Sequence, residues 1–285
     1  MYIAEVSDLH VTHWNWDIDW AATKDARSDV LIIAGDTSND VSTSMRVIKE
    51  AASHYPHVIF CSGNHEHYSS KNRLETVSDA DRFIEQTLLE LGYENVTFLN
   101  GPQSILIQDV LFVGANGWYD FTLAEGYSRE QQHDCWKQNS NDPMWIRFAP
   151  GGYPDKLAAR QAAEIAQIVA GAQDDDRVRQ IVVVTHTAPL FRCLRTTSIP
   201  DWDCMNGAYG NAHMQEVVVA DVKGKISNWF FGHTHHRNDF YQDGIRYISA
   251  PRGYQGERHL NWERPLLVDT DEEEVGSAFG EVEKV

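Results

Sequence analysis

Short runs of β-branched and apolar residues alternate along this chain with stretches of helical spacing, and this alternation most constrains its fold. Strands are expected at 2–7, 30–34, 57–61, 96–99, 104–107, 110–114, 180–184, 228–231, 238–242, 245–249 and near 265–268. Helices are expected at 40–53, 70–91 and 155–171, where apolar residues recur every three or four positions. Buried strands that alternate with helices indicate a layered α/β fold.

Two stretches break this pattern. Residues 117–154 are rich in Trp, Tyr, Asn, Asp and Gly, and we expect a loop-rich insert that forms an ordered lid or wall. Residues 187–212 form a second irregular segment, and the acidic tail 269–285 is expected to be solvated. Because no internal repeat and no linker separates two cores, residues 1–285 are interpreted as a single domain.

The charge balance restricts the partners. The chain has 24 basic and 42 acidic residues and a formal net charge of −18. Such a surface repels duplex nucleic acid, whereas a small anionic substrate can bind where divalent cations reverse the local charge. No apolar run is long enough to cross a membrane, and the first residues lack a signal-peptide pattern. Four cysteines without a close CxxC pair indicate reduced thiols in a cytoplasmic protein.

Five short polar motifs fall where predicted strands end. They are Asp8-Leu9-His10, Gly35-Asp36, Gly63-Asn64-His65-Glu66, the turn at His186, and Gly232-His233-Thr234-His235. In layered α/β folds, the loops at the carboxyl ends of strands converge on one crevice. The glycines before Asp36, Asn64 and His233 allow tight turns close to a ligand. We therefore expect side chains from all five motifs to meet.

The residue types in these motifs suit a pair of metal ions. Together they offer four His, two Asp and one Asn, and Asp36 has two carboxylate oxygens that can bridge two cations. A mixed N/O set without thiolate suits Mn, Fe, Zn, Ni or Co better than Mg or Ca. Two such ions roughly 3.5–4 Å apart can clamp a phosphoryl oxygen and activate a bridging water. Each motif alone also occurs by chance, and a lone strand-end His is more often a satisfied polar residue than a ligand.

The ordered set DxH, GD, GNHE, H and GHxH, over residues 8–235, resembles the calcineurin-like metallophosphoesterase superfamily, with weaker similarity continuing through 261–265. The resemblance implies a four-layer αββα sandwich with two central mixed β-sheets. It implies a first metal held by Asp8, His10, Asp36 and His235. It implies a second metal held by Asp36, Asn64, His186 and His233, with His65 as general acid or transition-state stabiliser. Segments 114–121, 139–148 and 251–257 are similar to a subgroup of small bacterial and phage members.

Departures from the family's protein phosphatases narrow the activity. Those enzymes resemble GDxVDRG and RGNHE, whereas this chain has GDTSNDV and SGNHE and lacks both arginines. The resemblance therefore favours a phosphodiester or nucleotide-type substrate, with a phosphomonoesterase or protein phosphatase as the alternative. A non-catalytic scaffold is a third reading, disfavoured because every ligand position is filled. The sequence leaves the oligomeric state open. Candidate substrate-binding residues are His67, Tyr68, Trp118, Arg147 and Arg252, and the aromatics at 118–127 are candidates for stacking on a base.

Overall fold

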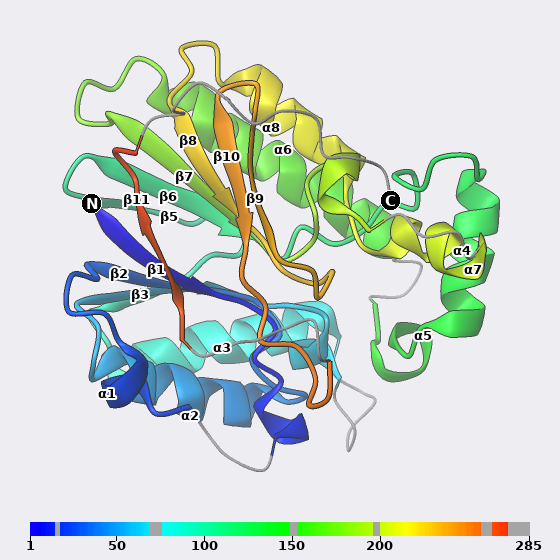
Figure 1. The fold of residues 1–285 in the computed structure, drawn as a ribbon, viewed down its shortest axis with the longest axis horizontal. Coiled ribbons are helices and arrows are strands. Elements are labelled where there is room, and N and C mark those ends of the chain that lie inside the picture. Colours follow the sequence, from blue (N-terminus) through cyan, green and yellow to red (C-terminus); the bar gives the residue numbers. More distant parts are fainter. Residues whose placement is uncertain (15–17, 69–75, 149–152, 196–199, 258–263, 273–285) are drawn as a thin grey trace, which may run out of the picture.

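The computed structural model describes residues 1–14, 18–68, 76–148, 153–195, 200–257 and 264–272. Two β-sheets lie face to face in the centre, and helices cover the outer face of each (Figure 1). None of the helices in the described ranges is long and apolar enough to span a bilayer.

The first sheet has the strand order β11-β1-β2-β3-β4. Strands β1 to β4 run parallel, and β11 pairs antiparallel with β1 at the edge. The strand bounds are β1 Tyr2–Val6, β2 Val30–Ala34, β3 His57–Cys61, β4 Val96–Phe98 and β11 Leu266–Asp269.

The second sheet has the order β5-β6-β7-β8-β10-β9. Its four inner strands are parallel, and the edge strands β5 and β9 are antiparallel to their neighbours. The bounds are β5 Ser104–Ile107, β6 Val110–Ala115, β7 Gln180–Thr185, β8 Ile226–Phe230, β9 Asn238–Gln242 and β10 Ile245–Ser249. Both sheets are therefore mixed, as expected.

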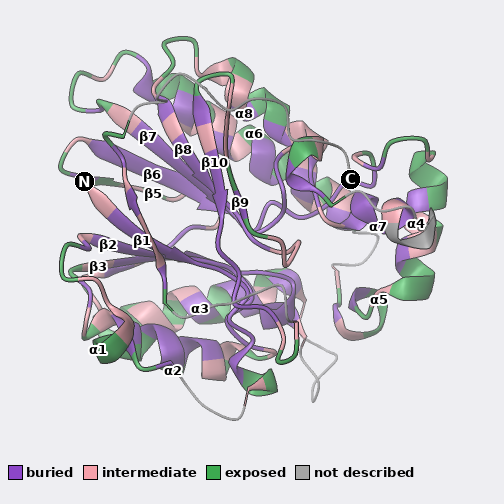
Figure 2. Cartoon of the chain, in the orientation of Figure 1, coloured by how far each residue is buried: buried purple, intermediate pink, exposed green. Residues whose placement is uncertain are grey.

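Three apolar cores hold these layers together. Because side chains alternate across a strand, Val30 and Ile32 of β2 pack between the two sheets while Leu31 and Ile33 pack against the helices. Helices α1 Trp20–Thr23, α2 Val41–Ala52 and α3 Val77–Leu91 cover the first sheet, and α6 Pro154–Ala172 and α8 Gln215–Ala220 cover the second. The buried residues of both sheets form one interior in Figure 2. The four-layer αββα sandwich is confirmed.

The loop-rich insert 117–154 also contains two helices, α4 Arg129–Asn139 and α5 Asp142–Trp145. A fourth core of Trp118, Tyr119, Phe121 and Trp136 orders it together with residues from the second irregular segment. That segment, 187–212, also contains a helix, α7 Pro200–Met205.

Helix α4 was missed because it has few apolar residues to give a helical period. A signal was nevertheless present in the sequence Ser128-Arg-Glu-Gln131. The Ser128 side chain accepts a hydrogen bond from the Gln131 backbone N–H, and the Gln131 side chain accepts one from Ser128. This reciprocal capping box marks a helix start even on a polar helix. Helix α3 begins at Val77, so the expected start at 70–75 lies outside the described residues, as do 261–263 and the tail from 273.

Asp81 on α3 is a buried carboxyl group whose ionisation opposes folding. Burial raises its pKa to about 7, whereas the pKa of an Asp in an unfolded chain is about 3.9. Between these values the folded chain binds a proton that the unfolded chain has released, so stability falls as pH rises through this window. We expect Asp81→Asn to raise the free energy of unfolding by on the order of 2 kcal/mol at pH 8 and to change it little near pH 4.5.

Thermal or urea denaturation at both pH values measures this effect. Asp134→Asn on the exposed face of α4 is the control, because it makes the same substitution at an exposed position. An equal gain from Asp81→Asn at pH 4.5 and pH 8 contradicts the prediction.

Candidate metal centre

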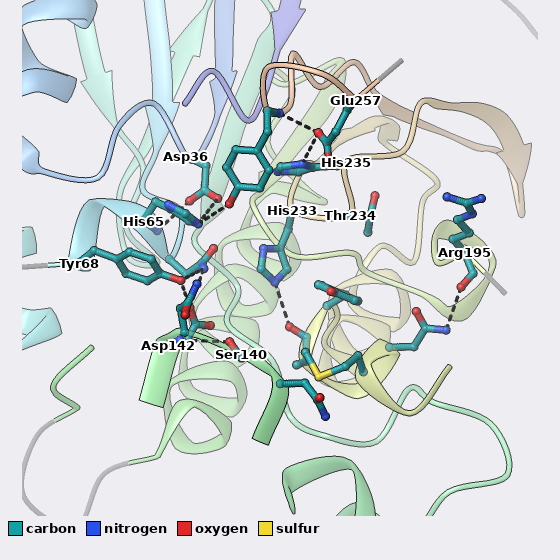
Figure 3. Close-up of a pocket in the computed structure, with 18 residues that line it drawn as sticks. Asp36, His65, Tyr68, Ser140, Asp142, Arg195, His233, Thr234, His235 and Glu257 are labelled. Atoms are coloured by element: carbon teal, nitrogen blue, oxygen red, sulfur yellow. Dashed lines mark hydrogen bonds and ion pairs between the residues drawn. The ribbon is translucent and has the colours of Figure 1, made fainter. Parts of the chain in front are cut away.

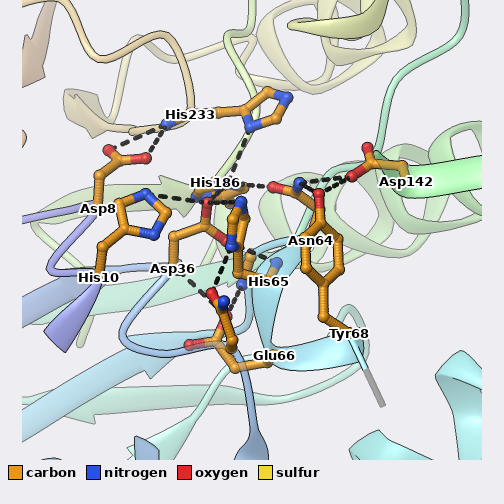
Figure 4. A network of polar contacts seen from close by, with 12 residues as sticks. Asp8, His10, Asp36, Asn64, His65, Glu66, Tyr68, Asp142, His186 and His233 are labelled. Atoms are coloured by element: carbon orange, nitrogen blue, oxygen red, sulfur yellow. Dashed lines mark hydrogen bonds and ion pairs between the residues drawn. The ribbon is translucent and has the colours of Figure 1, made fainter. Parts of the chain in front are cut away.

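Side chains from all five strand-end motifs meet at one place (Figure 4). Ligand atoms of Asp8, His10, Asp36 and His235 lie within 4.8 Å of one another, and so do those of Asp36, His186 and His233. Asn64 joins the second group, since its Oδ1 lies 3.1 Å from His186 Nε2. Asp36 is the one residue common to both groups.

Asp36 lies between the two groups. Its Oδ2 atom is 3.6 Å from His10 Nε2 on one side and 3.4 Å from His186 Nε2 on the other. Its Oδ1 atom accepts a hydrogen bond from the His65 backbone N–H at 2.9 Å. A carboxylate held in this way presents one oxygen to both histidine clusters, which is the geometry required of a bridging ligand.

Three of the four clustered histidines are fixed in one tautomer by hydrogen bonds on their outer side. His186 Nδ1 donates to the Ala34 carbonyl, His233 Nε2 to the Ala208 carbonyl and His235 Nδ1 to the Glu257 carboxylate, each at 2.9 Å. In a neutral ring, the other nitrogen, which faces into the cluster, then carries a lone pair. The inner nitrogens of His186 and His233 face each other at 3.1 Å, and those of His10 and His235 at 2.9 Å.

Lone pairs this close repel unless a cation lies among them. Burial alone would lower the pKa of His186, but the carboxylates of Asp36 and Asp8 outweigh it and raise the pKa to about 9. The same balance at His235, with Asp8 and Glu257 as the carboxylates, raises its pKa to about 10. The cluster thus attracts positive charge, and its His, Asp and Asn donors fit a pair of transition-metal ions.

The backbone at these positions is strained. Asp8, His10, Asp36, His233 and His235 all have positive φ angles, between 43° and 68°. Each such non-glycine residue costs on the order of 1 kcal/mol, and such strain persists mainly where function requires it. The backbone at Asp8 and His10 is therefore not the extended chain in which residues two apart point to the same side. Left-handed turns after β1, rather than strand alternation, bring both side chains into the cluster.

The glycines that precede the ligands have different roles. Gly35 has φ +83° and needs the freedom of glycine to make its turn. At Gly63 the reason is close approach, because an added Cβ would lie 2.1 Å from Asp36 Oδ1. At Gly232 an added Cβ would lie 2.7 Å from Asp8 Oδ2. Only the first of the three is the tight turn expected from the sequence.

Glu66 connects the loop after β2 with the loop after β3. Its buried carboxylate accepts hydrogen bonds from the backbone N–H groups of Asp36 at 3.1 Å, Thr37 at 2.6 Å and Gly63 at 2.7 Å. It also accepts one from the Ser44 hydroxyl at 3.1 Å. The loop after β2 is thereby fixed to the loop after β3, which sets the position of Asp36 relative to Asn64.

Asp142, at the start of α5, orients Asn64. Its Oδ1 accepts from Asn64 Nδ2 at 2.9 Å, so the amide oxygen of Asn64 turns toward His186. Asp142 also accepts hydrogen bonds from the hydroxyls of Tyr68 and Tyr119. Asp142 lies in the insert, and no sequence pattern indicates that it contacts Asn64, 78 residues away.

A family model described as calcineurin-like phosphoesterase matches residues 1–237, which contain every residue of the cluster. The chain belongs to the calcineurin-like phosphoesterase family. It is 22% identical over 282 residues to the uncharacterized protein L509 of Acanthamoeba polyphaga mimivirus, covering 94% of this chain and 96% of that one. The fold is similar to that of a phosphopantetheinyl hydrolase from Mycobacterium tuberculosis, with a TM-score of 0.72 and 19% identity over 93% of this chain and 94% of the other.

A cavity of about 650 Å³ opens over the cluster of this phosphoesterase (Figure 3). Asp36, Asn64, His65, His233 and His235 line its floor. The walls come from the two segments that broke the sequence pattern, from the loop after β10 and from Tyr68 in the loop after β3. They include Tyr68, Asn139, Ser140, Asn141, Asp142, Arg195, Met205, Asn206, Tyr209, Tyr254 and Glu257. The insert thus forms part of an ordered wall, as expected.

Of the five candidate substrate-binding residues, only Tyr68 lines the cavity; its ring stacks on His65 at 4.2 Å. His67, Trp118 and Arg252 are buried elsewhere, and Arg147 is exposed away from the cavity. Trp118 packs in the core of the insert, so it offers no face to a base. The guanidinium of Arg252 lies 4.1 Å from the Trp14 ring. Packing in the core of the insert therefore keeps Trp118 out of the cavity, and the other three also lie away from it.

Proposed function

We propose that this phosphoesterase hydrolyses phosphodiesters at a dinuclear centre. Asp8, His10, Asp36 and His235 would hold one ion, and Asp36, Asn64, His186 and His233 the other. The observation that carries this proposal is the placement of Asp36 Oδ2 between His10 and His186, 3.6 Å and 3.4 Å away. When bound, the ions would polarise the phosphoryl group and supply a hydroxide nucleophile at neutral pH.

His65 is the residue placed to assist departure of the leaving group. It lines the cavity, and its Nε2 lies 3.9 Å from Asp36 Oδ2, so it adjoins the centre without belonging to either ligand group. A protonated imidazole at this position would donate to the leaving oxygen as negative charge develops on it.

The charges around the cavity favour a diester over a monoester. Among the described residues that line it, Arg195 is the only Lys or Arg, and Figure 3 shows it across the cavity from His65 and Tyr68. A phosphomonoester dianion is usually gripped by arginines beside the reacting phosphorus. A diester carries a single negative charge, which two metal ions and His65 can balance without them.

The cavity wall offers neutral side chains that can form hydrogen bonds with a substrate. Asn139, Ser140, Asn141 and Asn206 line it, whereas the insert aromatics Trp118 and Phe121 are buried and unavailable to stack on a base. The volume of about 650 Å³ accommodates a group far larger than phosphate. The similar mycobacterial structure is named a phosphopantetheinyl hydrolase. A phosphopantetheinyl diester is therefore the first biological candidate to assay beside nucleotide diesters.

The test is a substrate panel with the Mn²⁺-loaded protein. It compares kcat/KM for bis-p-nitrophenyl phosphate and p-nitrophenyl phosphate, then for phosphopantetheinyl and dinucleotide diesters. We expect at least a tenfold preference for the diester of the matched pair, about 1.4 kcal/mol. A preference for the monoester would overturn the diester assignment. A protein that binds two ions and hydrolyses neither compound would favour the scaffold reading.

A further inference from the structure

Residues 251–257, which follow β10, are tied to the loop that carries Asp8. The backbone N–H of Arg252 donates to the Ser7 carbonyl and that of Gly253 to the Asp8 carbonyl, each at 2.9 Å. The indole N–H of Trp14 donates to the Gly253 carbonyl at 3.0 Å. The backbone on the N-terminal side of Tyr254 is thus fixed relative to the first ligand group.

Glu257 fixes the other side of Tyr254. One carboxylate oxygen, Oε2, accepts from the Tyr254 backbone N–H at 2.7 Å and from His235 Nδ1 at 2.9 Å. The Tyr254 ring packs on the rings of His10 and His235, with centroids 4.4 Å and 4.7 Å away. Tyr254 therefore has a defined position over the first ligand group rather than that of a loose loop residue.

The Tyr254 hydroxyl lies 3.1 Å from His65 Nε2. On the other side of that ring, His65 Nδ1 lies 2.7 Å from Asn39 Oδ1, and the Asn39 amide nitrogen faces His13 Nε2 at 3.1 Å. This arrangement makes Asn39 an acceptor for the His65 Nδ1 proton. The contact between Nε2 and the Tyr254 hydroxyl holds in both protonation states, because the hydroxyl donates to the lone pair of a neutral His65 and accepts from the Nε2–H of the protonated ring.

We propose that Tyr254 is a positioning residue for His65, a role that rests on the proposed phosphodiesterase function. Its hydroxyl holds the imidazole from the Nε2 side while Asn39 holds it from the Nδ1 side, so the ring edge is turned to the cavity before substrate enters. Tyr254 and His65 line the same cavity. Their contact therefore lies where we propose that the leaving group departs.

The hydrogen bond of the Tyr254 hydroxyl is separate from the packing of its ring. Phenylalanine at this position would keep the ring packing on His10 and His235 and remove only the hydrogen bond. Tyr254→Phe is thus a clean probe of the hydroxyl.

We expect Tyr254→Phe to lower kcat about tenfold with KM within about twofold, because a misplaced catalytic group costs rate rather than binding. The loss should be larger for an alkyl leaving group than for p-nitrophenolate, which departs without assistance. In a His65→Ala background the same change should have no further effect. Metal content should stay at two ions, and Tyr93→Phe, outside the cavity, is the control for the loss of a hydroxyl.

An unchanged kcat, or an equal loss with and without His65, would overturn the proposal. Loss of metal from Tyr254→Phe would also overturn it and would assign the residue to packing of the first ligand group. A second measurement is independent of turnover. The ¹⁵N NMR signal of His65 Nε2 should shift in Tyr254→Phe and not in Tyr93→Phe. If the signal shifts but the wild type hydrolyses no substrate, the proposed function is contradicted and the Tyr254–His65 contact is supported. If the wild type is active but the signal does not shift, the contact is contradicted and the proposed function is supported.

Discussion

Asp36→Asn is expected to remove both metal ions and to lower kcat by at least about 1,000-fold, or about 4 kcal/mol of transition-state stabilisation. Asp36 Oδ2 lies within 3.6 Å of inner nitrogens from both histidine clusters. An amide has a weaker oxygen donor, and it introduces N–H groups next to ring nitrogens. Because both groups share Asp36, this substitution weakens both metal sites at once.

Asp8→Asn provides the matched comparison, because Asp8 belongs only to the first group. We expect that variant to retain one ion per chain while Asp36→Asn retains none, as measured by inductively coupled plasma mass spectrometry after gel filtration. Two ions bound to Asp36→Asn, or equal metal loss in both variants, would contradict the shared role.

The clustering of the candidate ligands was predictable because their positions are set by simple topology. Each one follows the carboxyl end of a parallel strand, and parallel strands in a sheet deliver their end loops to one edge. The apolar composition of β1, β2 and β3 predicts that these strands are buried, so their ends could be located within about a residue. The left-handed backbone at His10 and His235 was not foreseen, although Asp and His tolerate it better than most residues.

The supporting residues were not predictable from sequence. Asp142, Glu257 and Tyr254 act through contacts with Asn64, His235 and His65 that span 78, 22 and 189 residues. No local periodicity encodes such contacts, because they depend on how the insert and the loop after β10 pack on the sheet edge. The prediction that Trp118 contacts substrate was misled by its position in the sequence. An aromatic residue close to a site motif is buried in a core at least as often as it contacts a ligand, and Trp118 packs in the core of the insert.

Glu66→Gln is expected to lower the free energy of unfolding by about 3–5 kcal/mol. All the partners of this carboxylate are donors: three backbone N–H groups at 3.1 Å or less, a longer one from Ser38, and the Ser44 hydroxyl. Glutamine would replace one acceptor oxygen by an N–H₂ group that faces these donors.

The same variant tests the ionisation state of Glu66. Burial and the neighbouring charge of Asp36 raise its pKa, while hydrogen bonds from the Gly63 and Thr37 N–H groups lower it. A protonated carboxyl would direct its own O–H at the same donors, so the geometry favours the carboxylate. Urea denaturation of the metal-free proteins at pH 7, with Glu50→Gln on α2 as control, measures the difference. A Glu66→Gln variant as stable as wild type would mean that Glu66 is protonated in the folded chain and that the link between the two loops is neutral.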